Sequence, residues 1–309
     1  MGSSSSQHRI TILAAFAAIY LIWGSTYLAI AWAVETIPPF LMIGSRFLVA
    51  GILIFGYGFL QNPHLPTRRQ WFWSAIAGFL MILVDYGALS WAEQYVPSGV
   101  ASVVFATTPI WLVLFDAGQR SQLLRRKALM GGILAGLLGV WLIFRSSKST
   151  MPVEAAHQSL HNWGLMVMLV ASLSWSVGTL VYRDRNTDVS VPTRMGMQML
   201  VGGALLLMVS SLTGEWDGFS IQQVSTRAWL SLLYLITFGT LVAHTAYLWL
   251  MEVQPPALVG TYAYVNPVIA LLLGWWLDNE PLTMLTGVAT CLILGAVVLI
   301  KQVNTPKEQ

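Results

Sequence analysis

The chain of 309 residues is 56% apolar and only 9% charged, with a mean hydropathy of +0.67, and this composition excludes an ordinary soluble domain. The net charge of +3 is small and gives no indication of a nucleic-acid partner. A single cysteine, Cys291, excludes an internal disulfide and a thiolate metal site, so we expect no metal and no cofactor.

Ten apolar stretches are long enough to cross a bilayer, which takes about 20 residues per helix. In chain order they span residues 10–31, 39–60, 71–91, 97–115, 129–145, 163–182, 192–213, 228–250, 257–277 and 283–300. The Ser-rich residues 1–7 are expected to be disordered. These features predict an all-α membrane protein with a tail at 1–9, five helices in 10–145, a linker at 146–162, five more helices in 163–301 and a second tail at 302–309.

The distribution of Lys and Arg predicts the orientation, because cytoplasmic loops carry an excess of both. With the N-terminus placed inside, one side holds Arg9, Arg68, Arg69, Arg120, Arg125, Arg126, Lys127, Arg183, Arg185, Lys301 and Lys307, and the other holds Arg145, Lys148 and Arg227. Arg46 and Arg194 fall within helices or at their edges. Both termini are therefore expected in the cytoplasm.

The two halves align with each other. Residues 46–51 fall over 198–203, which also lays Trp23 over Trp175, and a second register places Asp85 over His244. The loops carry opposite charge in the two copies: 61–70 and 116–128 are basic, whereas their counterparts 214–218 and 278–282 are acidic. Because each half has an odd number of helices, the second copy is expected to be inverted, with a binding cavity between the halves near the membrane midplane.

Four motifs carry a resemblance to a known family: residues 23–27 (Trp-Gly-Ser-Thr-Tyr), Arg46-Phe47, residues 91–99 (Trp-Ala-Glu-Gln-Tyr-Val-Pro-Ser-Gly), and residues 262–267 (Tyr-Ala-Tyr-Val-Asn-Pro) followed by Glu280-Pro-Leu. The chain resembles the EamA branch of the drug/metabolite transporter superfamily over essentially its whole length. The resemblance implies ten helices, two EamA repeats, an inner-membrane location, and export of amino acids, related metabolites or toxic compounds.

Three ionisable side chains fall inside predicted helices, where a charge costs roughly 2.5–3.5 kcal/mol or more unless it has a partner or a wet cavity. Arg46 and Asp85 are both expected about 10 Å from the outer surface, at 1.5 Å per residue. They form either a structural ion pair or a site for the carboxylate and ammonium of a zwitterion. Arg46 belongs to the family motif, whereas Asp85 departs from the family pattern.

His244 is the third such group. It is either a neutral packing residue or, with Asp85, a proton site that couples export to proton entry, since an unperturbed histidine titrates near neutrality. Among the aromatic residues, Trp23, Trp175, Tyr262 and Tyr264 are expected deep in the membrane, either lining a wide cavity or packing between helices.

Pro109 and Pro267 are predicted to break the fourth and ninth helices, and each frees the carbonyl four residues earlier, at Phe105 and Ala263. The adjacent Thr107, Thr108 and Asn266 can satisfy those carbonyls or contact substrate. The prolines serve either as kinks alone or as hinges beside the cavity. Glycines of the fifth and tenth helices predict close helix contact, with dimerisation as a further option.

The resulting hypothesis is a secondary transporter that exports small metabolites, amino acids first among them, by alternating access, and is either proton-coupled or an uncoupled facilitator. A multidrug or lipid-linked sugar exporter is the alternative. An enzyme is disfavoured because no nucleophile–base pair or ligand cluster is visible. We expect a multi-pass inner-membrane protein, monomeric or weakly dimeric. The candidate substrate-binding residues are Trp23, Tyr27, Arg46, Asp85, Thr108, Trp175, His244, Tyr262 and Asn266.

Overall fold

The structure is a computed structural model that describes residues 2–115, 127–146, 155–185, 189–254, 259 and 261–304, and all regular elements in these ranges are helices. The predicted all-α class is confirmed. Most of the basic loop 116–128, including Arg120, Arg125 and Arg126, lies outside the described residues, as do residues 147–154 of the predicted linker.

The first half contains α1 (Gly2–Val34), α2 (Pro39–Gln61), the continuous run α3 (Arg68–Gly78), η1 (Phe79–Tyr86) and α4 (Gly87–Ala92), then α5 (Ser98–Phe105), α6 (Thr108–Phe115) and α8 (Lys127–Ser146). The second half contains α9 (Ala155–Asp184), α10 (Val191–Leu212), a short turn η2 (Ile221–Gln223), the run α11 (Thr226–Tyr234), η3 (Leu235–Val242) and α12 (Ala243–Val253), then α14 (Tyr262–Asp278) and α15 (Met284–Asn304).

Two helix starts differ from the sequence prediction. The expected disorder of residues 1–7 is wrong for residues 2–7, because α1 begins at Gly2. Similarly, α9 begins at Ala155, eight residues before the predicted 163, because its polar first turns extend beyond the apolar span. In this extension His161 Nδ1 lies 2.7 Å from the Tyr95 carbonyl oxygen, a contact that secures the extra turns.

Two stretches, η1 and η3, are π-helical, which apolar periodicity does not predict. Each has eight residues, and each occupies the middle of a membrane-length helix, one in each half of the chain. The looser winding is uncommon and concentrates at functional sites. These two stretches are therefore the first structural markers of where the site lies.

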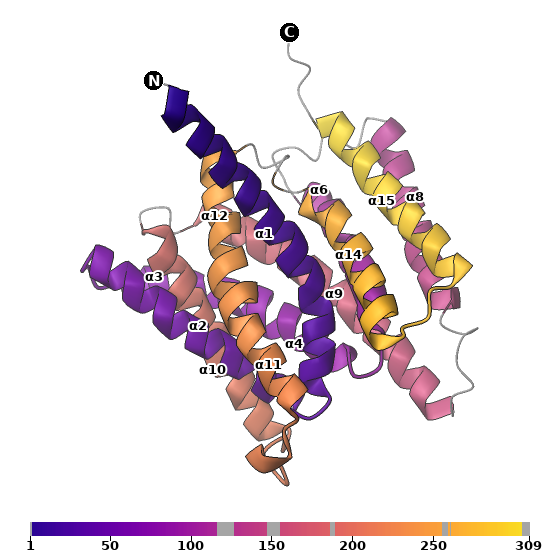
Figure 1. Cartoon of the computed structure of the whole chain (residues 1–309), viewed down its shortest axis with the longest axis horizontal. Helices are drawn as coiled ribbons and strands as arrows, with labels where there is room; N and C mark the ends of the chain where they lie inside the picture. The colour runs from indigo at the N-terminus through magenta and orange to yellow at the C-terminus, as the bar shows by residue number, and fades with distance from the viewer. Residues whose placement is uncertain are drawn as a thin grey trace.

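Helices α2 and α10 pack along their lengths through glycine. A Cβ added to Gly51 would lie 2.9 Å from the backbone nitrogen of Leu200, and one added to Gly203 would lie 2.7 Å from the backbone nitrogen of Leu48. A similar pair forms where Gly139 of α8 faces Ile293 of α15. Figure 1 shows α8 and α15 side by side at one edge of the molecule. The predicted close contact is confirmed at Gly136 and Gly139 of the fifth predicted helix, and it is wrong for Gly287 and Gly295 of the tenth, where an added Cβ would meet no atom within 4 Å.

The glycine contact predicts opposite effects for two substitutions in α2. Gly51→Ala forces backbone apart and is expected to lower the unfolding free energy by about 1–3 kcal/mol. Gly56→Ala has no atom within 4 Å of the new Cβ and is expected to raise it by about 0.5–1 kcal/mol through helix propensity. Thermal unfolding of the purified variants in detergent checks both, and equal effects would contradict the packing argument.

Carboxylates cap two helix N-termini from the opposite half of the chain. Glu215 accepts hydrogen bonds from the backbone nitrogens of Phe40 (3.1 Å) and Leu41 (2.8 Å) at the start of α2. Glu280 accepts bonds from Ser98 (2.7 Å) and Gly99 (2.9 Å) at the start of α5. Because a helix N-terminus favours negative charge, these carboxylates stabilise the contact between the two halves at one end of the molecule.

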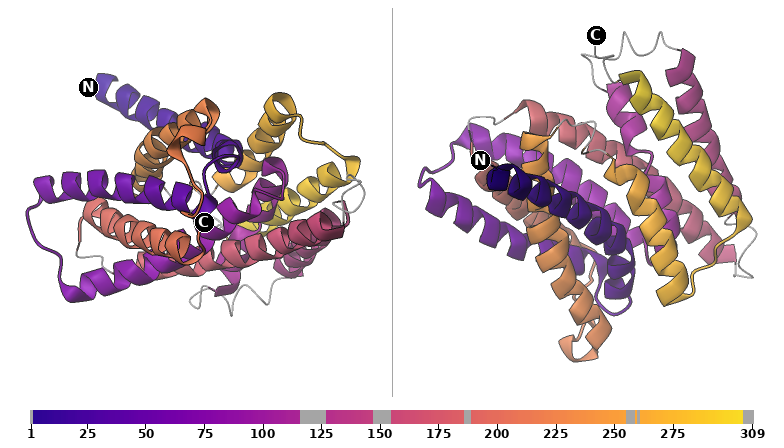
Figure 2. Two further views of the ribbon diagram at one scale, coloured as in Figure 1. Left: turned by 90° about the horizontal axis from the view of Figure 1, so that it is seen from below. Right: turned by 45° about the horizontal axis from the view of Figure 1, so that its top comes forward.

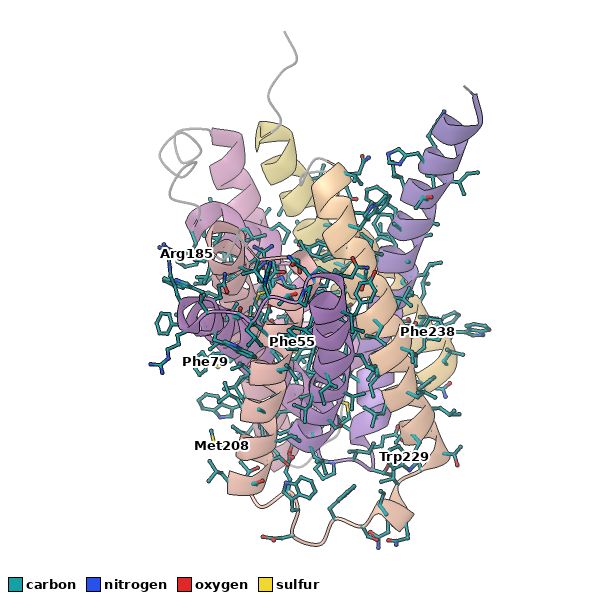
Figure 3. All side chains as sticks on the ribbon, turned by 90° about the vertical axis from the view of Figure 1, so that its left-hand side faces the viewer. Phe55, Phe79, Arg185, Met208, Trp229 and Phe238 are labelled. Atoms are coloured by element: carbon teal, nitrogen blue, oxygen red, sulfur yellow. The ribbon has the colours of Figure 1, made fainter. Side chains whose placement is uncertain are left out.

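The outer surface is apolar, as a bilayer requires. Phe79, Met208, Trp229 and Phe238 point away from the helices in Figure 3 and are 47%, 52%, 42% and 50% exposed. Within the described residues, six helices are long and apolar enough to span a membrane, and four shorter apolar helices accompany them, at Ser98–Leu112, Leu134–Ile143, Val265–Asp278 and Met284–Ala296. The chain is therefore a multi-pass membrane protein.

Candidate functional site

A central cavity of about 70 Å³ lies where α1, the two halves of the broken α5–α6 helix, α9, α14 and η1 converge. The two turned views in Figure 2 show these helices gathered between the α2–α10 pair and the α8–α15 pair. The lining residues come from both halves of the chain, and they are Trp23, Thr26, Tyr27, Asp85, Tyr86, Leu89, Ser102, Phe105, Ala106, Thr108, Trp175, Tyr262, Ala263, Asn266 and Pro267. The volume is enough for several water molecules.

The structure brings seven of the nine candidate binding residues into this one cavity. The seven are Trp23, Tyr27, Asp85, Thr108, Trp175, Tyr262 and Asn266. The other two, Arg46 and His244, are buried behind the wall, at 1% and 8% exposure. The side chain of Tyr264 lies outside what the structure describes.

Asp85 is the only acidic residue in the described lining of the cavity. It is 3% exposed, and its Oδ1 atom has no hydrogen-bond partner among the described residues. A buried carboxylate without a partner is unfavourable unless it holds a proton or a cation. The arrangement therefore suits a carboxyl group that holds either a proton or a cation.

Arg46 does not pair with Asp85: no ion pair joins them in the described part of the chain, so the structural ion pair is not formed. The Arg46 Nε atom donates to Thr240 Oγ1 at 2.9 Å, and Thr240 in turn donates to the Leu235 carbonyl oxygen at 3.0 Å. The guanidinium carbon lies 5.1 Å from the centre of the Tyr86 ring, so Tyr86 separates Arg46 from the cavity. Its Nη1 atom is without a partner among the described groups.

Trp23 closes the cavity on the side of His244. Its Nε1 atom donates to the Gly239 carbonyl oxygen at 3.2 Å, and its ring centre lies 5.7 Å from that of His244 and 5.1 Å from that of Tyr262. The helix predicted at 228–250, which carries the candidate residue His244, contributes no residue to the described lining, and Trp23, which packs against His244, lines the cavity in its place. The π-helical segment η3 lies behind the cavity wall, where Gly239 accepts the hydrogen bond from Trp23 and Thr240 accepts the one from Arg46.

The two prolines behave differently. The fourth helix is broken between Phe105 and Thr108, and the Thr108 hydroxyl donates at 2.7 Å to the Phe105 carbonyl that Pro109 frees. The predicted break at Pro267 is wrong, because α14 continues through it. Pro267 is the sixth residue of α14, so the helix loses the backbone bond to the Ala263 carbonyl but continues to Asp278.

Asn266 also binds backbone at this start of α14. With its amide nitrogen facing the acceptors, it donates to the carbonyl oxygens of Tyr262 and Tyr20, each at 3.2 Å. The amide thus ties α14 to α1 at the cavity wall, and it satisfies Tyr262 rather than the Ala263 carbonyl freed by Pro267.

The bracing of the two π-helical segments is similar in both halves. Helices α1 and α2 hold η3 through Trp23 and Arg46. Correspondingly, α9 and α10 hold η1: Ser174 donates to the Leu80 carbonyl oxygen at 2.8 Å, and Gln198 Nε2 lies 3.3 Å from Met81 Sδ. Gln198 is the residue that aligns with Arg46 in the sequence repeat.

Sequence reasoning missed Thr26, Tyr86, Ser102 and Phe105 in the lining and Thr240 behind it. Tyr86 follows Asp85 in η1, and the π-helical winding there brings both residues to the cavity. Ser102 lies one turn before Ala106, where the break begins, so the predicted kink was a usable signal for it. For Thr240 the sequence offers no such signal, because the residue that aligns with it in η1 is not a polar candidate either.

The fold and the cavity together define a multi-pass membrane transporter. Comparison with known sequences agrees: the profile of the EamA-like transporter family matches twice, at residues 9–145 and 162–302. The chain therefore belongs to the EamA-like transporter family.

Its relatives carry transporter names. The uncharacterized inner membrane transporter YedA of Escherichia coli K12 is 36% identical over 94% of this chain and 90% of its own. The uncharacterized transporter YoaV of Bacillus subtilis is 24% identical over 94% of both chains, and the protein PecM of Dickeya dadantii is 24% identical over 92% of this chain and 90% of its own. The first of these names and the membrane-length apolar helices together support a multi-pass inner-membrane protein.

A solved crystal structure shares the fold. It superposes with a TM-score of 0.62 over 94% of this chain and 96% of that one, at 21% identity. At this identity the likeness concerns the fold alone.

Proposed function

We propose that this protein exports small zwitterionic metabolites, amino acids first among them, by alternating access of the central cavity. The observation that carries the proposal is Asp85, a buried carboxylate with an unpartnered oxygen in a cavity walled by Trp23, Tyr27, Trp175 and Tyr262. The carboxylate is suited to an ammonium group, and the aromatic walls are suited to its apolar part.

We infer that the chain has ten transmembrane helices in two inverted five-helix repeats, 10–145 and 163–301. Several features support this: the double family match, the equal position of η1 and η3, and the reciprocal bracing of each by the other half. Rocking of one repeat against the other would then expose the cavity alternately to each side.

The charge distribution supports the proposed orientation, and this orientation sets the path that an exported substrate would take. In Figure 1, α1 begins and α15 ends at the same end of the molecule, while α10 and α14 end toward the opposite end. Glu215 and Glu280 belong to the connections that follow these two helices. With the basic loops inside, both termini are cytoplasmic and the acidic capping loops face outside. The substrate would therefore enter from the terminal end and leave toward the acidic end.

We infer that Asp85 takes the substrate ammonium and that Arg46 takes the carboxylate when Tyr86 moves aside. The free Nη1 atom of Arg46 supports this role, since Arg binds carboxylates through several donors. Thr108 and Asn266, which already bind backbone, fix the shape of the wall.

The proposal is tested by flux of labelled threonine, methionine and aromatic amino acids in proteoliposomes, with and without a pH gradient. Saturable flux that rises with the gradient supports a proton-coupled exporter. Saturable flux that ignores the gradient supports a facilitator. Absence of flux for the whole panel contradicts the proposed substrate class.

Proton coupling through His244 is tested by His244→Gln. The imidazole lies 6.2 Å from the Tyr247 ring and 5.7 Å from the Trp23 ring, centre to centre, so glutamine keeps much of the packing but removes the titration. We expect the pH dependence of transport to flatten while substrate affinity stays within about twofold. An unchanged pH profile would make His244 a packing residue.

The lipid-linked alternative requires a path from the bilayer to the cavity. An apolar groove of about 400 Å³ does open between α2, α10 and the helix formed by η3 and α12, lined in part by Leu53, Tyr57 and Trp249. None of its described lining residues belongs to the central cavity. A substrate that enters from water is therefore our first proposal.

A further inference from the structure

A second, larger cavity lies at the acidic end of the molecule, and none of the candidate residues lines it. Its volume is about 560 Å³, compared with about 70 Å³ for the central cavity. Its walls come from the ends of α1, α4 and α14 and from the turns that follow them. We call it the Glu93 cavity, and it is lined by Ala31, Val34, Glu35, residues 93–98 and residues 278–281.

Four carboxylates line this cavity, and three of them have partners. Glu280 caps α5, as described above. Asp278 accepts from Trp32 Nε1 at 2.7 Å and from Arg227 Nη1 at 3.4 Å, and Glu35 pairs with the same Arg227. No Lys or Arg belongs to the described lining, so Arg227 at its edge is the cation that offsets this charge.

Glu93 is the fourth carboxylate and differs from the rest. It follows the last residue of α4, it is 7% exposed, and neither of its oxygens has a hydrogen-bond partner among the described residues. An isolated buried carboxylate is costly in free energy unless it holds a proton or a positive group compensates it, and burial together with the nearby Glu280 carboxylate raises the pKa of Glu93 well above its usual range. In the wall of a cavity with a negative lining, a cationic ligand would take the place of that proton.

The cavity fits an organic ammonium better than a metal ion. No group of three or more His, Cys, Asp or Glu side chains in the described residues is arranged to hold a metal. A primary ammonium needs one counter-ion and an apolar or aromatic surface, and Glu93, Val96 and Tyr95 supply these in the lining.

We propose that the Glu93 cavity binds the primary ammonium group of an organic molecule, with Glu93 as its counter-ion. This is a second site, distinct from Asp85. Ammonium binding in the Glu93 cavity does not depend on transport. Only the idea that this cavity lies where substrate leaves the protein rests on the proposed function and orientation.

The test uses the full-length protein carrying Asp85→Asn, so that the central carboxylate does not contribute. Binding of benzylammonium is measured by tryptophan fluorescence in detergent, with benzyl alcohol as the uncharged probe. We expect saturable benzylammonium binding, at least tenfold weaker benzyl alcohol binding, and at least tenfold loss of benzylammonium affinity on adding Glu93→Gln. The matched control, Asp217→Asn, removes the same charge from an exposed loop outside the cavity and is expected to change the affinity less than twofold.

A second measurement does not depend on the folding of the Glu93→Gln variant. The wild-type protein is treated with a hydrophobic carbodiimide, and modification of Glu93 is followed by peptide mass spectrometry. Benzylammonium is expected to protect Glu93 at least fivefold, and benzyl alcohol is not. Equal binding of the two probes, unchanged affinity in Glu93→Gln, or equal labelling with and without benzylammonium would overturn the proposal. If the wild-type protein shows no amino-acid flux but benzylammonium still protects Glu93 from the carbodiimide, the result counts against the proposed function and leaves the Glu93 site in place.

Discussion

Asp85→Asn is expected to weaken transport of zwitterionic substrates by roughly 10- to 150-fold in KM, which corresponds to the loss of a charge-assisted contact of about 1.5–3 kcal/mol. The carboxylate is 3% exposed, with Oδ1 unpartnered among the described residues, and it is the one acidic group in the described cavity lining. Asparagine keeps the size of the side chain and removes the charge. The effect is measured as the concentration dependence of flux in proteoliposomes.

Two controls separate the charge from the fold. Asp217→Asn, in an exposed loop, is expected to leave the KM unchanged within twofold. An N-acetylated substrate, which lacks the ammonium, is expected to bind wild type and Asp85→Asn equally. A normal KM for the zwitterion in Asp85→Asn would remove Asp85 from the site.

Arg46 variants are expected to separate stability from transport. Arg46 is 1% exposed, and Arg46→Ala loses the bond to Thr240, the contact with Tyr86 and most of the side-chain volume. We expect a loss of about 2–4 kcal/mol in unfolding free energy, by analogy with other large-to-small substitutions in a packed interior. Arg46→Met retains most of the volume and removes a buried charge, so its stability is expected to stay within about 1 kcal/mol of wild type.

Both Arg46 variants are expected to lose transport, because neither anchors η3 through Thr240 nor offers donors to a carboxylate. Thermal unfolding and flux are measured on the same preparations. Arg68→Met, which replaces an exposed cation at the start of α3, serves as the control and is expected to match wild type in both. Full transport by Arg46→Met would contradict both roles of the guanidinium.

The sequence was sufficient for the placement of helices because lipid imposes a simple length rule on apolar runs. Each of the ten apolar stretches is helical over most of its described length. The differences occur where polar sequence extends a helix, as at Gly2 and Ala155, or where a helix continues through a proline, as at Pro267. Local tertiary support, which composition does not encode, decides these cases.

The site was predictable in part, for a physical reason. Polar and aromatic residues deep in an apolar helix are costly or bulky, so Asp85, Trp23 and Tyr262 stand out in the sequence, and all three line the cavity. The partner of Arg46 was not predictable, because Thr240 is a common helix residue. The π-helical winding of η1 and η3 shifts the facing of the residues that follow, and His244 lies behind Trp23 instead of lining the cavity.

The central claim, that substrate passes through the cavity between the halves, is tested most directly by blocking it after folding. Ser102 lines the cavity at 1% exposure, and Ser102→Cys in a Cys291→Ser background gives one thiol there. A bulky methanethiosulfonate reagent is expected to label this thiol during turnover, to reduce flux to the level of empty liposomes, and to release it on reduction. A thiol that stays unlabelled, or complete labelling with undiminished flux, would contradict the claim.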